Sequence, residues 1–438
     1  MARILIDGHN LALEQGTGVA TYARNLTEAI GALGHEAGVL YGSPAVYGAN
    51  PLVREIALFD PNSARRAPYW KKLTRQWFDQ VTSVFGVTAQ HVPITGAVVS
   101  RQHAARMPSC SLFYNCPNIF KFSRPYFNKL NSFVRVGFDQ PPGIFHWTYP
   151  LPVKARGSAN IYTLHDLVPL RLPFTTLDNK RYYFRLVKKI ADEADHIVTV
   201  SEHSRQDIIS LLNVPPERVT NTYQAVSVPQ RFIDRPDDEI AYEVQNILGL
   251  DYKKYFLFFG AMDPKKNIAR IVQAYQGART DMPLLVVGGL AWRLAHQRRM
   301  TTKSQDRQAV LDLGPYPENP RVRLIDYLPF DLLTTAIRGA RAVVFPSLYE
   351  GFGLPILETM QLGTPVISST ESSIPEVAGD AALLVDPYDT DAIRQAVETL
   401  AADDGLCAEL SARGPRQAAK FSAENHNARL QAVYSKFV

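Results

Sequence analysis

The sequence predicts an α/β protein of two domains, each built on a parallel sheet covered by helices. Short apolar runs typical of buried strands alternate with amphipathic helical stretches in both halves of the chain. At 438 residues the chain is also too long for one ordinary hydrophobic core, so more than one domain is expected. Its 46% hydrophobic and 20% charged residues describe a globular protein, not a disordered or fibrous one.

Apolar runs followed by polar or glycine-rich residues are predicted to be strands. In chain order they are 4–7, 160–164, 196–200, 255–259, 283–287, 321–325, 342–345 and 365–368. The five runs of the second half have the composition of buried strands. Ligands of open α/β sheets bind beyond the carboxyl ends of strands, so functional residues are expected in the loops that follow. Residues 45–135 do not fit this alternation, and the sequence does not order their elements.

Domain boundaries are predicted from a break in the periodicity. The proline- and charge-rich stretch 229–238 is polar and aperiodic, so it is interpreted as the interdomain linker. The first domain then spans 1–228 and the second spans 229–418. A closing helix at about 423–437 can pack back on the first domain.

A cytoplasmic protein is expected. A strand-like run begins directly after the first residues, without a basic and apolar leader, and no apolar run approaches the roughly 20 residues of a membrane span. Cys110, Cys116 and Cys407 lack metal-ligand spacing and are interpreted as free thiols of a reducing compartment.

The densest chemical motif spans 345–358, where a buried strand leads into a glycine-rich turn. A helix is predicted to start near Leu354, with Pro355 suited to its first position. The free N–H groups and the dipole of a helix start form an anion site suited to a diphosphate, and glycines let a ligand approach the backbone. Glu350 lies in the loop and Glu358 about one turn into the helix. Both carboxylates can therefore face one crevice and accept hydrogen bonds from sugar and ribose hydroxyls.

These glutamates, separated by seven residues around a Gly-Phe-Gly-Leu-Pro run, resemble the signature of family 4 glycosyltransferases, which are retaining enzymes. The runs 363–367 and 374–382 continue the match, which is dense over about 255–400. The resemblance implies the GT-B architecture, in which two Rossmann-like domains face a central cleft. It also implies that Glu350 contacts the donor sugar and Glu358 the nucleotide ribose. The backbone amides implied to hold the sugar and the diphosphate are those of Gly351, Phe352, Gly353 and Leu354.

A second motif follows the predicted strand 255–259. A lysine at the start of the next helix places an ammonium where a leaving diphosphate needs charge compensation. The run resembles the family segment that supplies the diphosphate-binding lysine, here Lys266. Lys265 replaces a commoner arginine, and Ala261 stands where many relatives carry another arginine. The alternative interpretation is that these are two surface lysines at the start of a helix, without a role in binding the diphosphate.

Two motifs of the first domain complete the predicted site. Gly16 and Gly18 follow the first strand, but Thr21 stands where a dinucleotide fingerprint has its third glycine. The run resembles instead the family's glycine loop, which faces the donor phosphates; a plain tight turn is the alternative. His165 resembles the histidine that lies against the donor sugar, where an imidazole can position the anomeric centre. A packed or capping histidine is the alternative for it, and Asp166 is expected to be structural.

Two further patterns are interpreted as helix caps. Ser201 follows a strand and precedes a helix, as an N-cap does. Asp389 and Asp391 match an Asp-x-Asp motif with which another glycosyltransferase fold binds a metal, but here they open a helix near Ala392. No metal or other cofactor is expected, since Lys266 and helix N-termini can supply the positive charge.

Positive charge is concentrated in the first domain. Residues 54–135 hold 12 lysines and arginines and only three acids, whereas the whole chain carries a net charge of +5. Within them, 65–78 interleaves cations with aromatic rings, which suits peripheral attachment to an anionic membrane or to a lipid diphosphate. A packed aromatic face with solvated charges is the alternative. Single-stranded nucleic acids bind the same residue types, but no nucleic-acid partner is expected.

Together these patterns predict a retaining glycosyltransferase of cell-surface polysaccharide biosynthesis. The donor is a nucleotide sugar, and the acceptor is a glycan or a polyprenyl-diphosphate-linked saccharide on the first domain. GDP-mannose is favoured over UDP-sugars, because the Pro-Lys-Lys-Asn and His-Asp-Leu runs resemble those of mannosyltransferases. The residues assigned to catalysis are His165, Glu350 and Lys266. The alternatives are a nucleotide-sugar epimerase of the same fold and a non-catalytic subunit.

Overall fold

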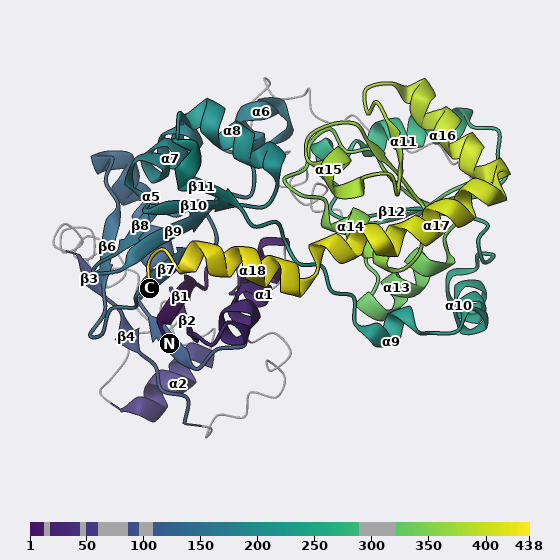
Figure 1. Ribbon diagram of the computed structural model, residues 1–438. Coiled ribbons are helices and arrows are strands. Elements are labelled where there is room, and N and C mark those ends of the chain that lie inside the picture. The colour runs from purple at the N-terminus through teal and green to yellow at the C-terminus, as the bar shows by residue number, and fades with distance from the viewer. Residues whose placement is uncertain (13–17, 44–49, 60–85, 96–107, 289–320) are drawn as a thin grey trace, which may run out of the picture.

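The computed structural model describes residues 1–12, 18–43, 50–59, 86–95, 108–288 and 321–438, which form two α/β lobes (Figure 1). The first lobe holds the strands β1 (Arg3–Asp7), β2 (Glu36–Tyr41), β3 (Val87–Thr88), β4 (Gln90–His91), β5 (Leu112–Asn115), β6 (Val134–Gly137), β7 (Ile144–Trp147), β8 (Val153–Ala155), β9 (Ala159–Thr163), β10 (His196–Thr199) and β11 (Val219–Asn221). Its helices are α1 (Gly18–Ala32), α2 (Pro51–Phe59), α5 (Ile119–Leu130), α6 (Val168–Arg171), α7 (Lys180–Glu193) and α8 (Glu202–Leu212).

The second lobe holds the strands β12 (Phe256–Phe259), β13 (Leu284–Val287), β14 (Val322–Ile325), β15 (Ala342–Phe345), β16 (Val366–Ser369) and β17 (Leu383–Val385). Its helices are α9 (Gln230–Ile233), α10 (Asp237–Glu243), α11 (Ile268–Gly277), α13 (Phe330–Gly339), α14 (Leu354–Gln361), α15 (Ile374–Ala378), α16 (Thr390–Ala402) and α17 (Asp404–Ala418). The last helix, α18 (Ala423–Tyr434), returns to the first lobe (Figure 1). No helix among the described residues is long and apolar enough to cross a bilayer.

The large sheet of the first lobe has the order β11-β10-β9-β7-β1-β2-β5-β4. All its pairs are parallel except β4 with β5. The chain order of the strands reverses at β1, between β2 and β7. A sheet of this kind offers a ligand crevice beyond the carboxyl ends of the strands at that switch point. A smaller sheet, β3-β6-β8, lies beside it.

The sheet of the second lobe is wholly parallel, in the order β14-β13-β12-β15-β16-β17. Its switch point lies between β12 and β15, whose side chains are buried on both faces. The five strands predicted in this half are all present. The expectation that all of them are buried is wrong for β14, because it lies at the sheet edge and exposes Arg323 and Leu324.

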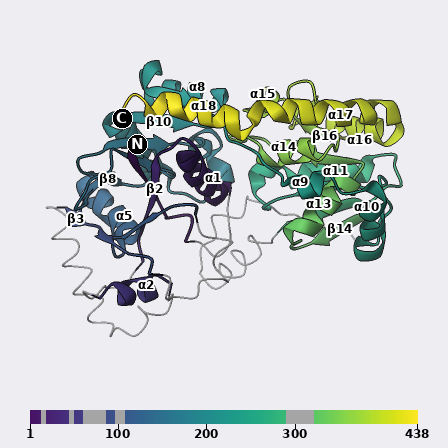
Figure 2. The same ribbon diagram turned by 60° about the horizontal axis from the view of Figure 1, so that its bottom comes forward.

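The chain crosses between the lobes at about 222–229 and again at about 419–423. The two crossings are hydrogen-bonded to each other, with Val226 N donating to Phe421 O at 3.2 Å. The assignment of 229–238 as the interdomain linker is wrong, because the chain crosses before it. This stretch belongs to the second lobe, where it forms α9 and the start of α10 against α13. Arg338 holds it there by donating to three backbone carbonyls of this stretch. Figures 1 and 2 show α17 and α18 as one band that spans both lobes.

Candidate active site

The loops after β12 and β15 meet at the switch point of the second sheet. Lys266 Nζ lies 2.6 Å from Glu350 Oε1, and Lys265 Nζ lies 3.6 Å from Glu350 Oε2. Buried Asn267 ties the loops together, because its amide donates to the carbonyls of Pro346 (3.1 Å) and Pro387 (2.6 Å). The structure therefore brings together two charged groups that are 84 residues apart in the sequence.

The charges of this cluster are strongly coupled. Burial alone would raise the pKa of the Glu350 carboxyl, but Lys266 and Lys265 outweigh it and hold that pKa below its usual range. Burial lowers the pKa of Lys266, and Glu350 opposes this shift. Burial would also lower the pKa of Lys265, yet Glu350, Asp166 and Asp263 together raise it. Glu350, only 6% exposed, is thus held ionised between two ammonium groups.

The glycine-rich turn leaves several backbone donors unpaired. Gly353 has φ 111°, a left-handed conformation that favours glycine, and α14 begins at the next residue, so Pro355 stands at its second position and not its first. Ser373 Oγ donates to the carbonyls of Glu350 and Phe352, at 2.9 Å each, and so fixes the turn from behind. Among the described residues, no acceptor is found for the N–H groups of Gly351, Phe352, Gly353 and Leu354. Such a helix start is suited to an anion.

Glu358 lies one turn into α14 on the same side as the lysines. Its side chain is half-buried. Burial raises the pKa of Glu358 to about 7, and the Lys266 ammonium acts in the opposite direction. The carboxyl therefore titrates near neutral pH, and a hydrogen-bonding ligand can change its charge.

His165 belongs to the first lobe, and its backbone faces the Gly351 turn of the second lobe. Its Nε2 lies 3.0 Å from the carbonyl oxygen of Thr148; since a carbonyl only accepts, Nε2 carries the proton. Nδ1 is then the acceptor and faces the Gln224 amide at 3.5 Å. Burial lowers the pKa of His165, although Thr148 and Asp166 oppose it. A neutral ring with an acceptor nitrogen can position a sugar hydroxyl.

The loops of the two lobes touch at Gly351. A Cβ placed on Gly351 would lie 2.8 Å from the carbonyl oxygen of His165 and 3.1 Å from the side chain of Asp166. Asp166 Oδ1 accepts from Val168 N at 3.1 Å, as expected of a structural residue. Its Oδ2 also lies 4.0 Å from Lys265 Nζ, which the sequence did not indicate.

The glycine loop of the first lobe is described only in part. Gly18 opens α1, and a Cβ on it would lie 3.8 Å from the side chain of Leu354 at the start of α14. Gly16 lies outside the described residues. The described part of this loop therefore lies against the start of α14.

Helix α8 contacts the second lobe through hydrogen bonds that the motifs did not reveal. Tyr349 Oη donates to Asp207 Oδ2 at 2.5 Å. Glu376 accepts from the backbone N–H of Glu202, at 2.9 and 3.2 Å, and burial raises its pKa to about 7. Both contacts join residues more than 140 positions apart, so no local spacing indicates them.

The interpretations of the two cap motifs are confirmed. Ser201 accepts from Ser204 N at 3.0 Å as the N-cap of α8. Asp389 accepts from the N–H groups of Asp391 (2.8 Å) and Ala392 (3.1 Å), and so caps α16, which begins at Thr390. None of the three cysteines, all in the described part of the chain, forms a disulfide, as predicted. The basic run 65–78 lies outside the described residues.

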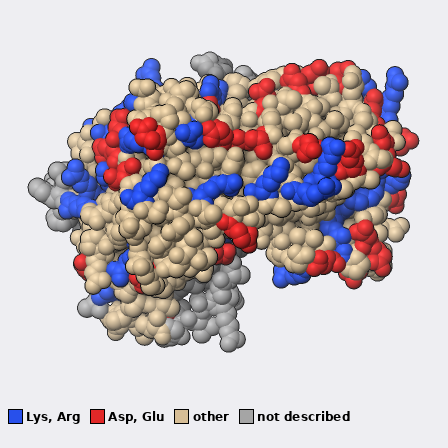
Figure 3. Space-filling view, viewed as in Figure 1, with Lys and Arg blue, Asp and Glu red and all other residues tan. Residues whose placement is uncertain are grey.

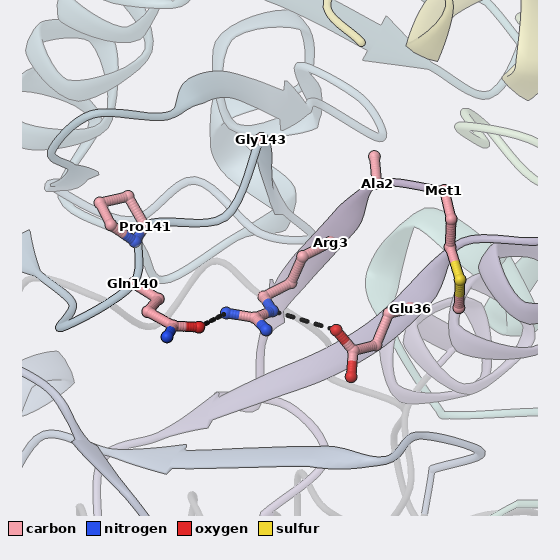
Figure 4. A pocket seen from close by; sticks show the side chains of 7 residues that line it. All are labelled: Met1, Ala2, Arg3, Glu36, Gln140, Pro141 and Gly143. Carbon is pink, nitrogen blue, oxygen red and sulfur yellow. Dashed lines mark hydrogen bonds and ion pairs between the residues drawn. The ribbon is translucent and has the colours of Figure 1, made fainter.

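A hollow of the first lobe lies away from these loops, at the opposite end of its strands. Figure 3 shows acidic and basic side chains interspersed on the face it views. The hollow measures about 440 Å³ and lies at the amino ends of β1 and β2, where Arg3 pairs with Glu36 at 3.1 Å; Figure 4 shows the side chains that line it. The other residues that line it are Met1, Ala2, Gln140, Pro141 and Gly143. Ligands of parallel sheets bind at the other end of the strands.

Comparison with known proteins connects both lobes to one family. The family model of glycosyl transferases group 1 matches residues 243–417, and that of Glycosyltransferase Family 4 matches residues 83–228. The O-antigen chain mannosyltransferase B of Escherichia coli is 36% identical over 270 residues, which cover 60% of this chain and 67% of that relative. The serotype-specific mannosyltransferase WbdA of Escherichia coli is 28% identical over 288 residues, which cover 64% of this chain and 34% of that longer protein. The solved structure of Anabaena Alr3699/HepE in complex with UDP and glucose matches over the full length of both chains, with a TM-score of 0.63 at 14% identity.

Proposed function

The chain belongs to family 4 of the glycosyltransferases and has their GT-B fold, and on that premise we propose that it transfers mannose from GDP-mannose, with retention of configuration. The acceptor is a glycan or a polyprenyl-diphosphate-linked saccharide of polysaccharide biosynthesis. The choice of mannose is supported by the names of its relatives, which are O-antigen and serotype-specific mannosyltransferases. Peripheral membrane attachment through 65–78 remains a prediction.

One observation carries the proposal: Lys266 and Glu350 converge beside the start of α14, whose first N–H groups find no acceptor among the described residues. A diphosphate seated there receives backbone hydrogen bonds and competes with Glu350 for the Lys266 ammonium. The Glu350 carboxylate is then released to accept hydrogen bonds from hydroxyls of the donor sugar. Glu358 lies one turn further along α14, in reach of the ribose.

The reaction proposed is a transfer on one face of the sugar. The acceptor hydroxyl oxygen bonds to the anomeric carbon as the bond from that carbon to the diphosphate oxygen breaks. The hydroxyl proton passes to the departing diphosphate, whose charge Lys266 and the α14 amides stabilise. In the donor complex the acceptor nitrogen of His165 exchanges its long contact with the Gln224 amide for a sugar hydroxyl and so orients the anomeric centre. No protein atom bonds covalently to the sugar in this scheme.

A transfer assay tests the proposal. The protein is incubated with radiolabelled GDP-mannose, or with UDP-glucose in parallel, and with a lipid extract that contains polyprenyl-diphosphate-linked oligosaccharides. We expect label to pass from GDP-mannose into a product that an α-mannosidase cleaves, and Glu350→Ala to abolish this transfer.

Three other outcomes contradict parts of the proposal. Conversion of the donor to an epimer without acceptor identifies an epimerase. Donor binding without transfer to any acceptor identifies a non-catalytic subunit. A stable sugar adduct mapped to a residue of this chain by mass spectrometry excludes the one-face mechanism.

A further inference from the structure

A chain of buried polar side chains runs from the last helix to the active site. Tyr434 Oη on α18 lies 2.7 Å from His146 Nδ1, and His146 Nε2 lies 2.7 Å from Thr163 Oγ1. Thr163 Oγ1 in turn lies 2.9 Å from Tyr22 Oη on α1. The Tyr22 ring meets the His165 ring edge to face, with centroids 4.8 Å apart. The first three of these residues are fully buried, and Tyr22 is 2% exposed.

The hydrogen-bond partners fix the direction of the first two bonds. Burial, together with nearby histidines, lowers the pKa of His146 to about 3, so the ring is neutral and has one donor and one acceptor nitrogen. No other acceptor is found for the Tyr434 hydroxyl in the described parts of the chain. The Tyr434 hydroxyl therefore donates to His146 Nδ1, which accepts, and the single ring proton lies on Nε2, which donates to Thr163. The Tyr434 hydroxyl thus selects the tautomer of His146.

Tyr22 helps to orient His165. Among the described residues, the ring of His165 is also held by the 3.0 Å hydrogen bond to the carbonyl of Thr148 and by the longer 3.5 Å contact with the amide of Gln224. A ring with one short hydrogen bond can still tilt about that bond, and the adjacent Tyr22 ring limits the tilt. The Tyr22 ring is itself held by its hydrogen bond to Thr163.

We propose that Tyr434 is a positioning residue. It acts on His165 through His146, Thr163 and Tyr22. The last helix therefore belongs to the active-site scaffold, although it reaches the first lobe only after the chain has completed the second. This inference rests on the proposed function in one point, because that function is what places His165 at the donor sugar. The position of the ring itself can be observed without turnover.

Nitrogen-15 NMR of histidine side chains tests the position directly. Tyr434→Phe removes only the hydroxyl, and the His165 signal is assigned with His165→Asn. The matched control is Tyr255→Phe, which also removes a fully buried hydroxyl, here bonded to the carbonyl of Ala336 at 2.6 Å in the second lobe. We expect Tyr434→Phe to shift the signals of both His146 and His165, and Tyr255→Phe to shift neither. A shift of His146 alone overturns the proposal.

The same comparison can be made by another route if Tyr434→Phe does not fold. Tyr22→Phe breaks the chain of hydrogen bonds at its other end, next to His165. It leaves the phenyl edge in place and removes its anchor. The expected result is again a changed His165 signal, and an unchanged signal refutes the proposed contact.

Transfer kinetics test the consequence for catalysis. Tyr434→Phe should lower kcat about tenfold, because small displacements of a positioning group cost one to two orders of magnitude, with KM for GDP-mannose changed by less than about twofold. The loss should vanish when the same substitution is made in His165→Ala. An equal fractional loss in that background refutes the proposal. Wild-type protein that transfers no sugar refutes the proposed function instead, and the NMR result still decides the positioning.

Discussion

Replacing Lys266 by methionine is expected to impair turnover much more than donor binding. The ammonium lies 2.6 Å from Glu350, and at an effective dielectric constant of about 20 this pair interacts by about 6 kcal/mol. A phosphate oxygen at about 3 Å would interact by about 5.5 kcal/mol. Donor binding thus replaces the Glu350 partner of Lys266 by a phosphate at nearly equal interaction energy. Lys266 stabilises the transition state more than the bound donor, because the departing diphosphate gains negative charge there. One such electrostatic group lowers the activation free energy by about 3–4 kcal/mol.

The expected result is a fall in kcat of about 10²- to 10³-fold, with the Kd for GDP changed by less than about tenfold. Steady-state transfer from GDP-mannose gives the first quantity and titration calorimetry gives the second. Lys265→Met is the matched control, because within the described parts of the chain its ammonium makes longer contacts, of 3.6 Å with Glu350 and 4.0 Å with Asp166. Equal kcat losses in the two variants, or loss of GDP binding with kcat intact, would show that Lys266 does not act mainly on the departing diphosphate.

Three other predictions follow from the same site. The pKa of Glu358 is about 7 in the folded protein against 4.5 ordinarily, so its contribution to stability is present below about pH 4.5 and is lost as pH rises through 7. Urea unfolding should show a loss of about 2–3 kcal/mol over this window that Glu358→Gln removes; an unchanged pH profile contradicts this. Gly351→Ala should lower the transfer rate at least about tenfold, since its Cβ would meet the His165 carbonyl at 2.8 Å, whereas Gly31→Ala, with nothing within 4 Å, should not. Tyr349→Phe should lower the free energy of unfolding by about 1–3 kcal/mol, because a buried hydrogen bond is lost; urea midpoints equal to wild type would exclude this.

The part of the site on the second lobe could be predicted because its signals are local. Glu350, the glycine turn and Glu358 belong to one strand–loop–helix unit, and Lys266 follows the neighbouring strand in the sheet. In a parallel sheet the carboxyl ends of such strands meet at one edge, so the loops must converge. The fold class followed from the same alternation of apolar runs and helices.

Other features depend on partners that are far away in the sequence. Tyr434 meets His146 across 288 positions, and Tyr349 meets Asp207 across 142, without any spacing that marks either pair. The stretch 229–238 is polar like a linker, yet it is fixed because the distant Arg338 satisfies its carbonyls. Tertiary contacts of this kind override local composition.

Hydrogen–deuterium exchange with and without GDP shows whether the two loops of the second lobe share one diphosphate site. We expect GDP to slow exchange at the amides of 351–354 and, in the same titration, in the segment that contains Lys266, because both would line that site. The peptides around Arg3 and Glu36 should not change. Protection in only one of the two site segments, or in neither at saturating GDP and UDP, would contradict this expectation.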